Sequence, residues 1–202
     1  MANSRIVMEE GRLYHIYNHA CGDEDFFRSA ENYFFFMKRY QRYVDPIAET
    51  YAYCLMPNHF HLLVRMKEMN RIGNKKLLPI KNNTPDYVFS FSLLFNSFAK
   101  AYNAQYQRRG SLFVHSFNRI QVDSDEYLRK LIIYIHRNPV NHGFVDHPWQ
   151  WEFSSYNRIL AGKPYWLQAK RVIEIFYDTE NFVFNHQSAV SLDDELTLEK
   201  DF

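Results

Sequence analysis

Alternating apolar and polar positions predict four strands in this chain. An apolar stretch at residues 13–18 indicates the first strand, and residues 51–66 indicate two strands joined at Met56-Pro57-Asn58. Pro fixes φ and Asn tolerates left-handed geometry, so these residues suit a turn between strands. A fourth strand is expected at residues 112–122.

Apolar positions three and four residues apart predict two helices between these strands. The first helix follows Ser29, a good capping residue, and ends at Asp45-Pro46 because Pro disfavours helix at the residue before it. The second begins near Pro85-Asp86 and ends at Arg108-Arg109-Gly110, where Gly suits the C-terminal cap. The polar residues 67–85 show no clear period and are expected to form a long, mobile loop.

A third helix is expected after the fourth strand, with Asp123 or Ser124 as its cap. Since Pro139 follows, this helix should end at Arg137 or Asn138. The order strand, helix, strand, strand, helix, strand matches the split ferredoxin-like arrangement, an antiparallel sheet with helices packed on it. The chain is therefore predicted to have an α+β, ferredoxin-like fold with one extra helix on its C-terminal side.

One domain is predicted for most of the chain. Residues 1–160 are assigned to it, and residues 161–202 to a C-terminal extension of unknown role in which residues 172–176 suggest a short helix. The end of this extension is acidic, because residues 187–202 carry five acids and one Lys, a net charge of −4. The other residues then carry +5 within the total of +1, a mild basic bias that permits a nucleic-acid partner without requiring one.

Composition narrows the class of protein. With 47% hydrophobic and 18% aromatic residues among 202, the chain can bury a substantial core and is not expected to be disordered. The two cysteines, Cys21 and Cys54, form no close-spaced metal motif and favour a reduced, cytoplasmic setting. We expect no signal peptide and no membrane partner, because no apolar run reaches the length of a membrane span.

Two histidines stand two residues apart in the third predicted strand. Because side chains alternate across a strand, His59 and His61 should share one face, and the apolar residues between and after them should face the core. Two imidazoles on one strand face can hold a divalent metal ion, since His is the commonest metal ligand. The alternative, a pair of half-exposed histidines on a sheet, stays open on spacing alone.

The third predicted helix supplies a tyrosine and an amide for the same chemistry. Tyr127, Tyr134 and Asn138 fall together at one edge of its buried stripe, and the last two are one turn apart. A tyrosine at such an edge is often a packing residue with its hydroxyl in water. An amide oxygen is nevertheless an acceptable ligand for Mg²⁺ or Mn²⁺. Held by the two histidines and Asn138, such an ion could polarise a phosphate that the phenol attacks.

Two sequence blocks, in this order and at this separation, connect the chain with a known enzyme family. They are LMPNHFHLLV at residues 55–64 and YIHRNPV at residues 134–140, and shorter matches lie at residues 14–16, 110–113, 122–128 and 151–156. Together the blocks span roughly residues 11–160. With them the chain resembles the REP-associated tyrosine transposases, a group of single-tyrosine HUH transposases.

This resemblance implies both a site and a reaction. His59 and His61 match the metal-binding histidines of the family, Asn138 its third metal ligand, and Tyr134 its catalytic tyrosine. The implied enzyme uses Mg²⁺ or Mn²⁺ to nick single-stranded DNA beside an imperfect hairpin. It forms a 5′-phosphotyrosine link, leaves a free 3′-hydroxyl and later rejoins the DNA. Because the bond energy stays in the covalent link, no nucleotide cofactor is expected.

The basic residues depart from the family pattern. Family members often carry more positive charge after the Leu112-Phe113 pair, whereas residues 114–119 here hold only Arg119 as a firmly charged side chain. Since phosphate contacts drive DNA affinity, binding is expected to be weaker or to use other surfaces. The candidate DNA contacts are Lys100, Arg108, Arg109, Arg119 and Arg137. The two consecutive arginines also suit the negative end of the second helix, and both interpretations stay open.

Other functions are compatible with parts of this pattern. The same fold without turnover would be a domesticated DNA-hairpin-binding protein, and the same chemistry serves rolling-circle replication initiators and relaxases. Histidines that only pack would leave an RNA-binding or structural α+β module. The sequence also leaves open the hairpin and cleavage sequence, the working metal ion, and the choice between a monomer and a homodimer.

Overall fold

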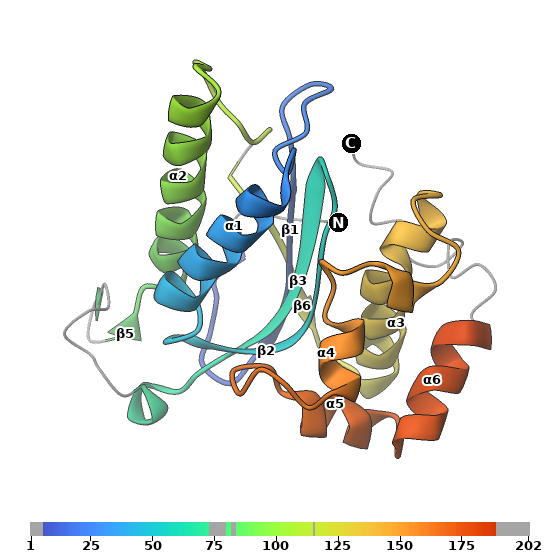
Figure 1. The fold of residues 1–202 in the computed structure, drawn as a ribbon. Coiled ribbons are helices and arrows are strands. Elements are labelled where there is room, and N and C mark those ends of the chain that lie inside the picture. Colours follow the sequence, from blue (N-terminus) through green and yellow to red (C-terminus); the bar gives the residue numbers. More distant parts are fainter. Residues whose placement is uncertain (1–5, 73–79, 82–83, 115, 189–202) are drawn as a thin grey trace.

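A four-stranded antiparallel sheet forms the centre of the protein (Figure 1). The computed structural model describes residues 6–72, 80–81, 84–114 and 116–188. The strands, in the sheet order β2-β3-β1-β6, are β2 (Ala48–Leu55), β3 (His59–Met66), β1 (Leu13–His19) and β6 (Asn118–Val122). With a helix after β1 and another after β3, this is the ferredoxin-like arrangement. The predicted fold class is confirmed.

The central strand β1 decides which residues meet on the sheet. It pairs with β3 so that His19 lies opposite His59 and Tyr17 opposite His61, and it pairs with β6 on its other side. Because side chains alternate along each strand, positions 15, 17 and 19 of β1 face the same way as positions 59 and 61 of β3. Five polar or aromatic side chains are thereby gathered on one face of the sheet.

Helices α1 (Ala30–Tyr43) and α2 (Tyr87–Gln105) cover the other face (Figure 1). Phe60 of β3 points into this layer, where its ring lies 5.5 Å from Phe36 of α1 and 5.2 Å from Phe95 of α2, measured between centroids. Phe36 and Phe60 are fully buried. The predicted alternation, with Phe60 in the core and the two histidines on the opposite face, is confirmed.

Helix α3 (Asp125–Asn141) lies against the histidine face, with α4 (Tyr156–Leu160), α5 (Ala169–Ile175) and α6 (Thr179–Ser188) beside it (Figure 1). Ser124 is the N-cap, and its hydroxyl accepts a hydrogen bond from the Tyr127 N–H at 3.2 Å. Leu131, Ile132 and Ile135 are fully buried and fix the face that α3 turns to the sheet. In the part of the chain that the structure describes, no helix is long and apolar enough to cross a membrane.

Three predicted boundaries are wrong. Helix α2 ends at Gln105, with Tyr106 as its C-cap and Gln107 in the left-handed conformation, rather than at residues 108–110. Helix α3 continues through Pro139 to Asn141 rather than ending before the proline. Pro139 has no N–H to donate and its ring crowds the carbonyl four residues earlier, but the last turn is still closed because the His142 N–H bonds the Asn138 carbonyl at 3.0 Å. Strand β6 covers residues 118–122 rather than 112–122. Phe113 still forms an isolated bridge with Ala20, but this bridge is two residues out of register with the pair Tyr17–Asn118 of the β1–β6 ladder, so the chain leaves the strand between them.

The predicted loop at residues 67–85 contains some regular structure where it is described. A 3₁₀ turn, η1, covers Met69–Arg71, and β4 (Ile80–Lys81) pairs with β5 (Thr84–Pro85). Residues 73–79 and 82–83 lie outside the described residues, so the mobility of this loop stays a prediction.

The described part of the C-terminal extension packs on the rest of the protein. The Gln168 N–H donates to the Thr50 carbonyl of β2 at 2.8 Å, and Leu167 forms a bridge with the same residue. The predicted short helix exists as α5, and α6 follows it. The boundary at residue 160 stays a prediction, and residues 189–202 of the acidic end lie outside the described residues.

Candidate functional site

The four residues predicted for metal binding and nucleophilic attack come together between β3 and α3. The Nε2 of His59 lies 2.7 Å from the Oδ1 of Asn138, and the Nε2 of His61 lies 3.4 Å from the Nδ2 of the same amide. The ring of Tyr134 meets the ring of His61 edge-on, with 5.4 Å between centroids. Residues that are more than 70 positions apart in sequence therefore share one site.

The two histidines are oriented by neighbours that the sequence analysis did not assign to the site. The Nδ1 of His61 lies 3.0 Å from the Nε2 of His15, and the Nδ1 of His59 lies 2.8 Å from the Oδ1 of Asn58. Each imidazole is thus held through Nδ1, which turns its Nε2 toward Asn138. Partners of this kind fix the tautomer and ring orientation of metal-binding histidines.

Two further histidines enclose the site. The ring of His19 stacks on His59 at 4.6 Å, and the ring of His142 lies 4.9 Å from His59, both measured between centroids. The sequence did contain an indication that His15 and His19 face the same way. They are an even number of residues apart, as His59 and His61 are, so each pair shares one face of its strand. Using this indication required the pairing of β1 with β3.

The contacts of His59 indicate a position for a cation. Both Asn58 Oδ1 and Asn138 Oδ1 are acceptors, and they lie on opposite ring nitrogens of His59, whereas a neutral imidazole carries a single N–H. With the amide orientations in the structure, one contact therefore brings two lone pairs together. A cation between Nε2 of His59 and the Asn138 oxygen would remove this conflict.

Double protonation of His59 is not a favourable alternative. Burial, followed by the nearby His61 and His19, holds the pKa of His59 well below its usual value of 6.5, although the bond to Asn138 acts in the opposite direction. His59 is therefore neutral at neutral pH. Neutral imidazole is the form that binds metal ions.

The spacing of the donor atoms also fits an ion such as Mg²⁺ or Mn²⁺. Two ligands about 2.1 Å from an octahedral ion, at right angles to each other, lie about 3 Å apart. The 2.7 Å between His59 Nε2 and Asn138 Oδ1 is close to this spacing. Among the described residues, no group of three or more His, Cys, Asp or Glu could hold a metal ion, so a third protein ligand at this position would have to be of another type, such as the Asn138 amide.

Tyr134, the predicted nucleophile, lies beside these donor atoms, in contact with the ring of His61. It lies one turn before Asn138 on α3, so both side chains address the same space. Only 3% of Tyr134 is exposed, in contrast to Tyr127, which is half-buried on the same helix. The arrangement places a phenol beside two imidazoles and an amide, and all four side chains are buried, so a phosphate would reach them only after surrounding side chains move.

A buried polar cluster fixes the far side of α3. The Nδ1 of His136 lies 2.9 Å from the Nε2 of His186 on α6, and its Nε2 lies 2.7 Å from the Oγ of Ser155. The same hydroxyl accepts a hydrogen bond from the Tyr53 N–H of β2 at 2.9 Å. The helix that carries the candidate nucleophile is therefore held both to the sheet and to α6.

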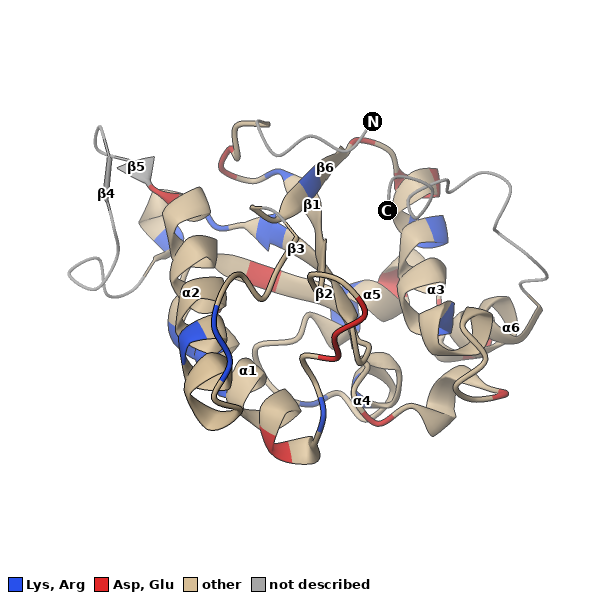
Figure 2. Cartoon of the chain, turned by 90° about the horizontal axis from the view of Figure 1, so that it is seen from above, with Lys and Arg blue, Asp and Glu red and all other residues tan. Residues whose placement is uncertain are grey.

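The predicted DNA-contacting residues of α2 do not lie at this site. Lys100 is on α2 and Arg108 and Arg109 follow its C-terminal end, whereas α3 covers the opposite face of the sheet (Figure 1). Figure 2 shows Lys and Arg spread over several elements, including α1, α2 and α3. The Arg108 guanidinium pairs with the Glu24 carboxylate, while Lys100 and Arg109 are exposed. Their contact with DNA stays a prediction.

The other two predicted contacts are engaged within the protein. Arg119 is 5% exposed, and its Nε donates to the carbonyl of Ile6. Arg137 donates from Nη1 to the carbonyl of His186 at 2.9 Å. The structure therefore uses both arginines to hold neighbouring segments, and any role of either in DNA binding stays a prediction.

Comparison with known sequences gives one relevant relative. The chain is 27% identical over 117 residues to a Haemophilus influenzae protein named "Putative REP-associated tyrosine transposase". The match covers 58% of this chain and 64% of the relative, so the chain spans less than two thirds of that protein's length. A scan against protein-family models finds no match.

Comparison with solved structures supports the fold. A REP-associated tyrosine transposase, solved bound to a REP hairpin, superposes with a TM-score of 0.60 at 17% identity, covering 80% of this chain and 86% of that one. A bacterial tRNA(His) guanylyltransferase-like protein in complex with GTP reaches a TM-score of only 0.40 at 10% identity, with 68% of each chain covered. The resemblance found in the sequence is therefore confirmed: the chain is similar in sequence to a protein named as a REP-associated tyrosine transposase and shares the fold of another.

Proposed function

We propose that this chain is a DNA transposase of the REP-associated tyrosine type, which nicks and rejoins single-stranded, hairpin-flanked DNA. Tyr134 is the nucleophile, and His59, His61 and Asn138 hold Mg²⁺ or Mn²⁺. The observation that carries the proposal is the meeting of these four side chains between β3 and α3. A hairpin-DNA partner is supported by the solved relative with the same fold, whose structure contains a REP hairpin. A cytoplasmic location goes with this function.

In the proposed reaction the phenol oxygen of Tyr134 loses its proton and attacks the scissile phosphorus. A Tyr–O–P bond forms, the bond to the 3′-oxygen breaks, and that oxygen takes up a proton to become the free 3′-hydroxyl. The bound metal ion would supply polarisation of the phosphate. His15 and Asn58 keep the two imidazoles in the tautomers that direct Nε2 to the ion. A 3′-hydroxyl later reverses the attack, which rejoins the strand.

The test is a denaturing gel with labelled hairpin DNA from beside the gene and either Mg²⁺ or Mn²⁺. We expect a protein-linked DNA band with the wild type and none with Tyr134→Phe, because only the attacking oxygen is lost. Tyr127→Phe is the matched control, since it removes a hydroxyl from the same helix outside the donor set. A protein-linked band of equal intensity in Tyr134→Phe would refute the assignment of the nucleophile.

One observation favours a second function, a hairpin-binding protein without turnover. Tyr134 is almost fully buried, so a phosphate reaches its hydroxyl only after side chains around it move. If several flanking hairpins form a native complex but no covalent band with the wild type, this second function is supported.

A further inference from the structure

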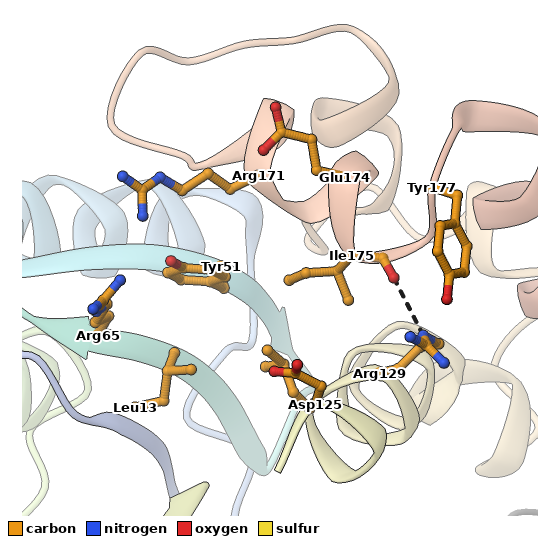
Figure 3. Close-up of a pocket in the computed structure, with 10 residues that line it drawn as sticks. Leu13, Tyr51, Arg65, Asp125, Arg129, Arg171, Glu174, Ile175 and Tyr177 are labelled. Carbon is orange, nitrogen blue, oxygen red and sulfur yellow. Dashed lines mark hydrogen bonds between the residues drawn. The ribbon is translucent and has the colours of Figure 1, made fainter. Parts of the chain in front are cut away.

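A second site lies on the α3 face of the sheet, at the opposite end from the histidines. A pocket of about 620 Å³ is lined there by residues from β1, β2, β3, α3, α5 and the turn after α5 (Figure 3). Its volume is within the usual range of ligand-binding pockets. The pair Leu13–Arg65 marks this end of the β1–β3 ladder, and the pair His19–His59 marks the other end.

Arginines dominate the polar lining of this pocket. Arg65, Arg129 and Arg171 contribute three positive charges, against Asp125 and Glu174. These arginines come from three separate elements, so the cluster is a product of the fold rather than of a local basic run. Guanidinium groups are the preferred partners of phosphate because they can donate two parallel hydrogen bonds.

Two of the arginines are anchored in a way that leaves their ends available to a ligand. The Nε of Arg65 donates to the Gly11 carbonyl at 2.9 Å. The Nε of Arg129 donates to the Ile175 carbonyl at 3.2 Å (Figure 3). The backbone bond therefore uses Nε and fixes each planar group. The terminal nitrogens are the atoms that can reach a phosphate.

Tyr177 stands at the mouth of the pocket in a strained conformation. Its φ is +72°, a value that bulky residues rarely adopt, yet the side chain is 80% exposed. Its ring lies over the Arg129 guanidinium, 5.7 Å from centroid to Cζ (Figure 3). The positive φ follows from the place of Tyr177 directly after the C-cap Phe176 of α5, where a helix commonly ends in a left-handed residue and Gly is usual. Burial does not explain why a tyrosine occupies this position. An exposed aromatic face beside arginines is suited to stacking an unpaired base.

The pocket and the candidate active site are close enough to share one strand of DNA. Arg129 precedes Tyr134 by five residues on α3, a rise of about 8 Å. The six-residue separation of the two ends of the β1–β3 ladder corresponds to about 20 Å. A short unpaired segment can span these distances.

We propose that this pocket binds an unpaired nucleotide of the DNA strand that the active site cleaves, with its phosphate on Arg65 and Arg171 and its base on Tyr177. The inference rests on the proposed function for the identity of the strand. It names the subsite that holds the single-stranded part of the substrate, next to the hairpin.

Binding is tested with the full chain, using a labelled oligo(dT) of about 12 nucleotides as a probe that cannot pair. We expect Arg171→Gln and Tyr177→Gly each to lower its affinity about tenfold, as is typical for loss of a base stack or a phosphate contact. Arg171→Gln should also lower the salt slope of binding by about one. The matched control is Arg42→Gln, an exposed arginine beside Tyr43 on α1, across the sheet.

The variant Tyr177→Gly distinguishes a loss of oligo(dT) affinity from a loss of folding stability. Gly adopts a positive φ without strain, so this variant should unfold at the same or a higher temperature than the wild type while binding oligo(dT) more weakly. Unchanged affinity in both pocket variants, or an equal loss in Arg42→Gln, would overturn the proposal. The covalent band of the otherwise wild-type protein is scored separately, so a missing band counts against the proposed function and not against the pocket.

Discussion

At the scale of single residues, the site depends on how two histidines are oriented. His59 and His61 both direct Nε2 to Asn138 because Asn58 and His15 occupy their Nδ1 atoms. That these side chains would lie together could be predicted from spacing and resemblance, since the two histidines alternate on one strand and Asn138 follows Tyr134 by one turn. The residues that orient the two histidines could not be predicted, because His15 reaches His61 only through the pairing of β1 with β3.

Removing either of the two proposed metal-binding histidines should abolish metal binding. We expect His59→Ala and His61→Ala each to lose binding of Mn²⁺ measured by calorimetry, and also metal-dependent cleavage, because two of three protein donors cannot hold the ion. His147→Ala is the control, since His147 is exposed and stacks on Trp149 away from the site. Wild-type Mn²⁺ affinity in both site variants would remove the proposed metal site.

Removing the partner of His61 should weaken metal binding without abolishing it. In His15→Leu the imidazole of His61 keeps its donor atom but loses the bond that orients it, so Mn²⁺ affinity should fall about 10- to 100-fold. His15→Gln, which can still bond the Nδ1 atom, should recover part of the loss. An affinity equal to that of the wild type in His15→Leu would show that this contact does not position His61.

At the scale of elements, α3 is held by packing on one side and by a buried histidine pair on the other. Helix α6 contributes His186, which bonds His136 and lies near Arg137. The buried face of α3 could be predicted from the spacing of its apolar residues. Its last turn could not, because whether a helix continues past Pro139 depends on hydrogen bonds of the following residues, such as the one from the His142 N–H to the Asn138 carbonyl. Similarly, the start of β6 was misplaced because the change of register between the Phe113 bridge and the β1–β6 ladder cannot be seen in the sequence.

Acid should release α6 from α3. Burial, as the largest cause, lowers the pKa of His186 to about 4 in the folded protein, against 6.5 in the unfolded chain. The unfolded state therefore binds the proton more readily, so the free energy of unfolding falls as the pH drops from 6.5 to about 4, by about 3 kcal/mol at most. His186→Leu should show a shallower loss over this range in urea unfolding, whatever its stability at neutral pH.

The comparison is between slopes, because other buried histidines titrate in both proteins. The same slope in His186→Leu and in the wild type would contradict the account of how α6 is held.

At the scale of the whole molecule, one face of the sheet is covered by the aromatic core and the other face carries the candidate site. Aromatic packing with α1 and α2 fills one face, and the histidines, Tyr134 and the arginine pocket lie on the face covered by α3 (Figure 1). Element order was enough to predict the ferredoxin-like fold. The pocket was not predictable, since Arg65, Arg129 and Arg171 meet only when the C-terminal extension packs beside α3.

The positions of basic residues in the sequence were a poor basis for predicting which side chains contact DNA. Arg119 was a natural candidate for DNA contact on its strand, yet the fold turns it toward the Ile6 carbonyl and the ring of Phe117. Sequence shows that a strand carries an arginine but not which side of it another segment covers. We therefore expect DNA to bind at the pocket that is lined by Arg65, Arg129 and the exposed ring of Tyr177.

The central claim is that Tyr134 forms a covalent bond with DNA in a site built by β3 and α3. The most direct measurement is mass spectrometry of the protein after reaction with hairpin DNA and Mn²⁺, followed by digestion of both. We predict a nucleotide adduct on the peptide that contains Tyr134, formed only with metal and lost in His59→Ala. An adduct on Tyr127 or another tyrosine, or an adduct that forms equally without metal, would contradict the account.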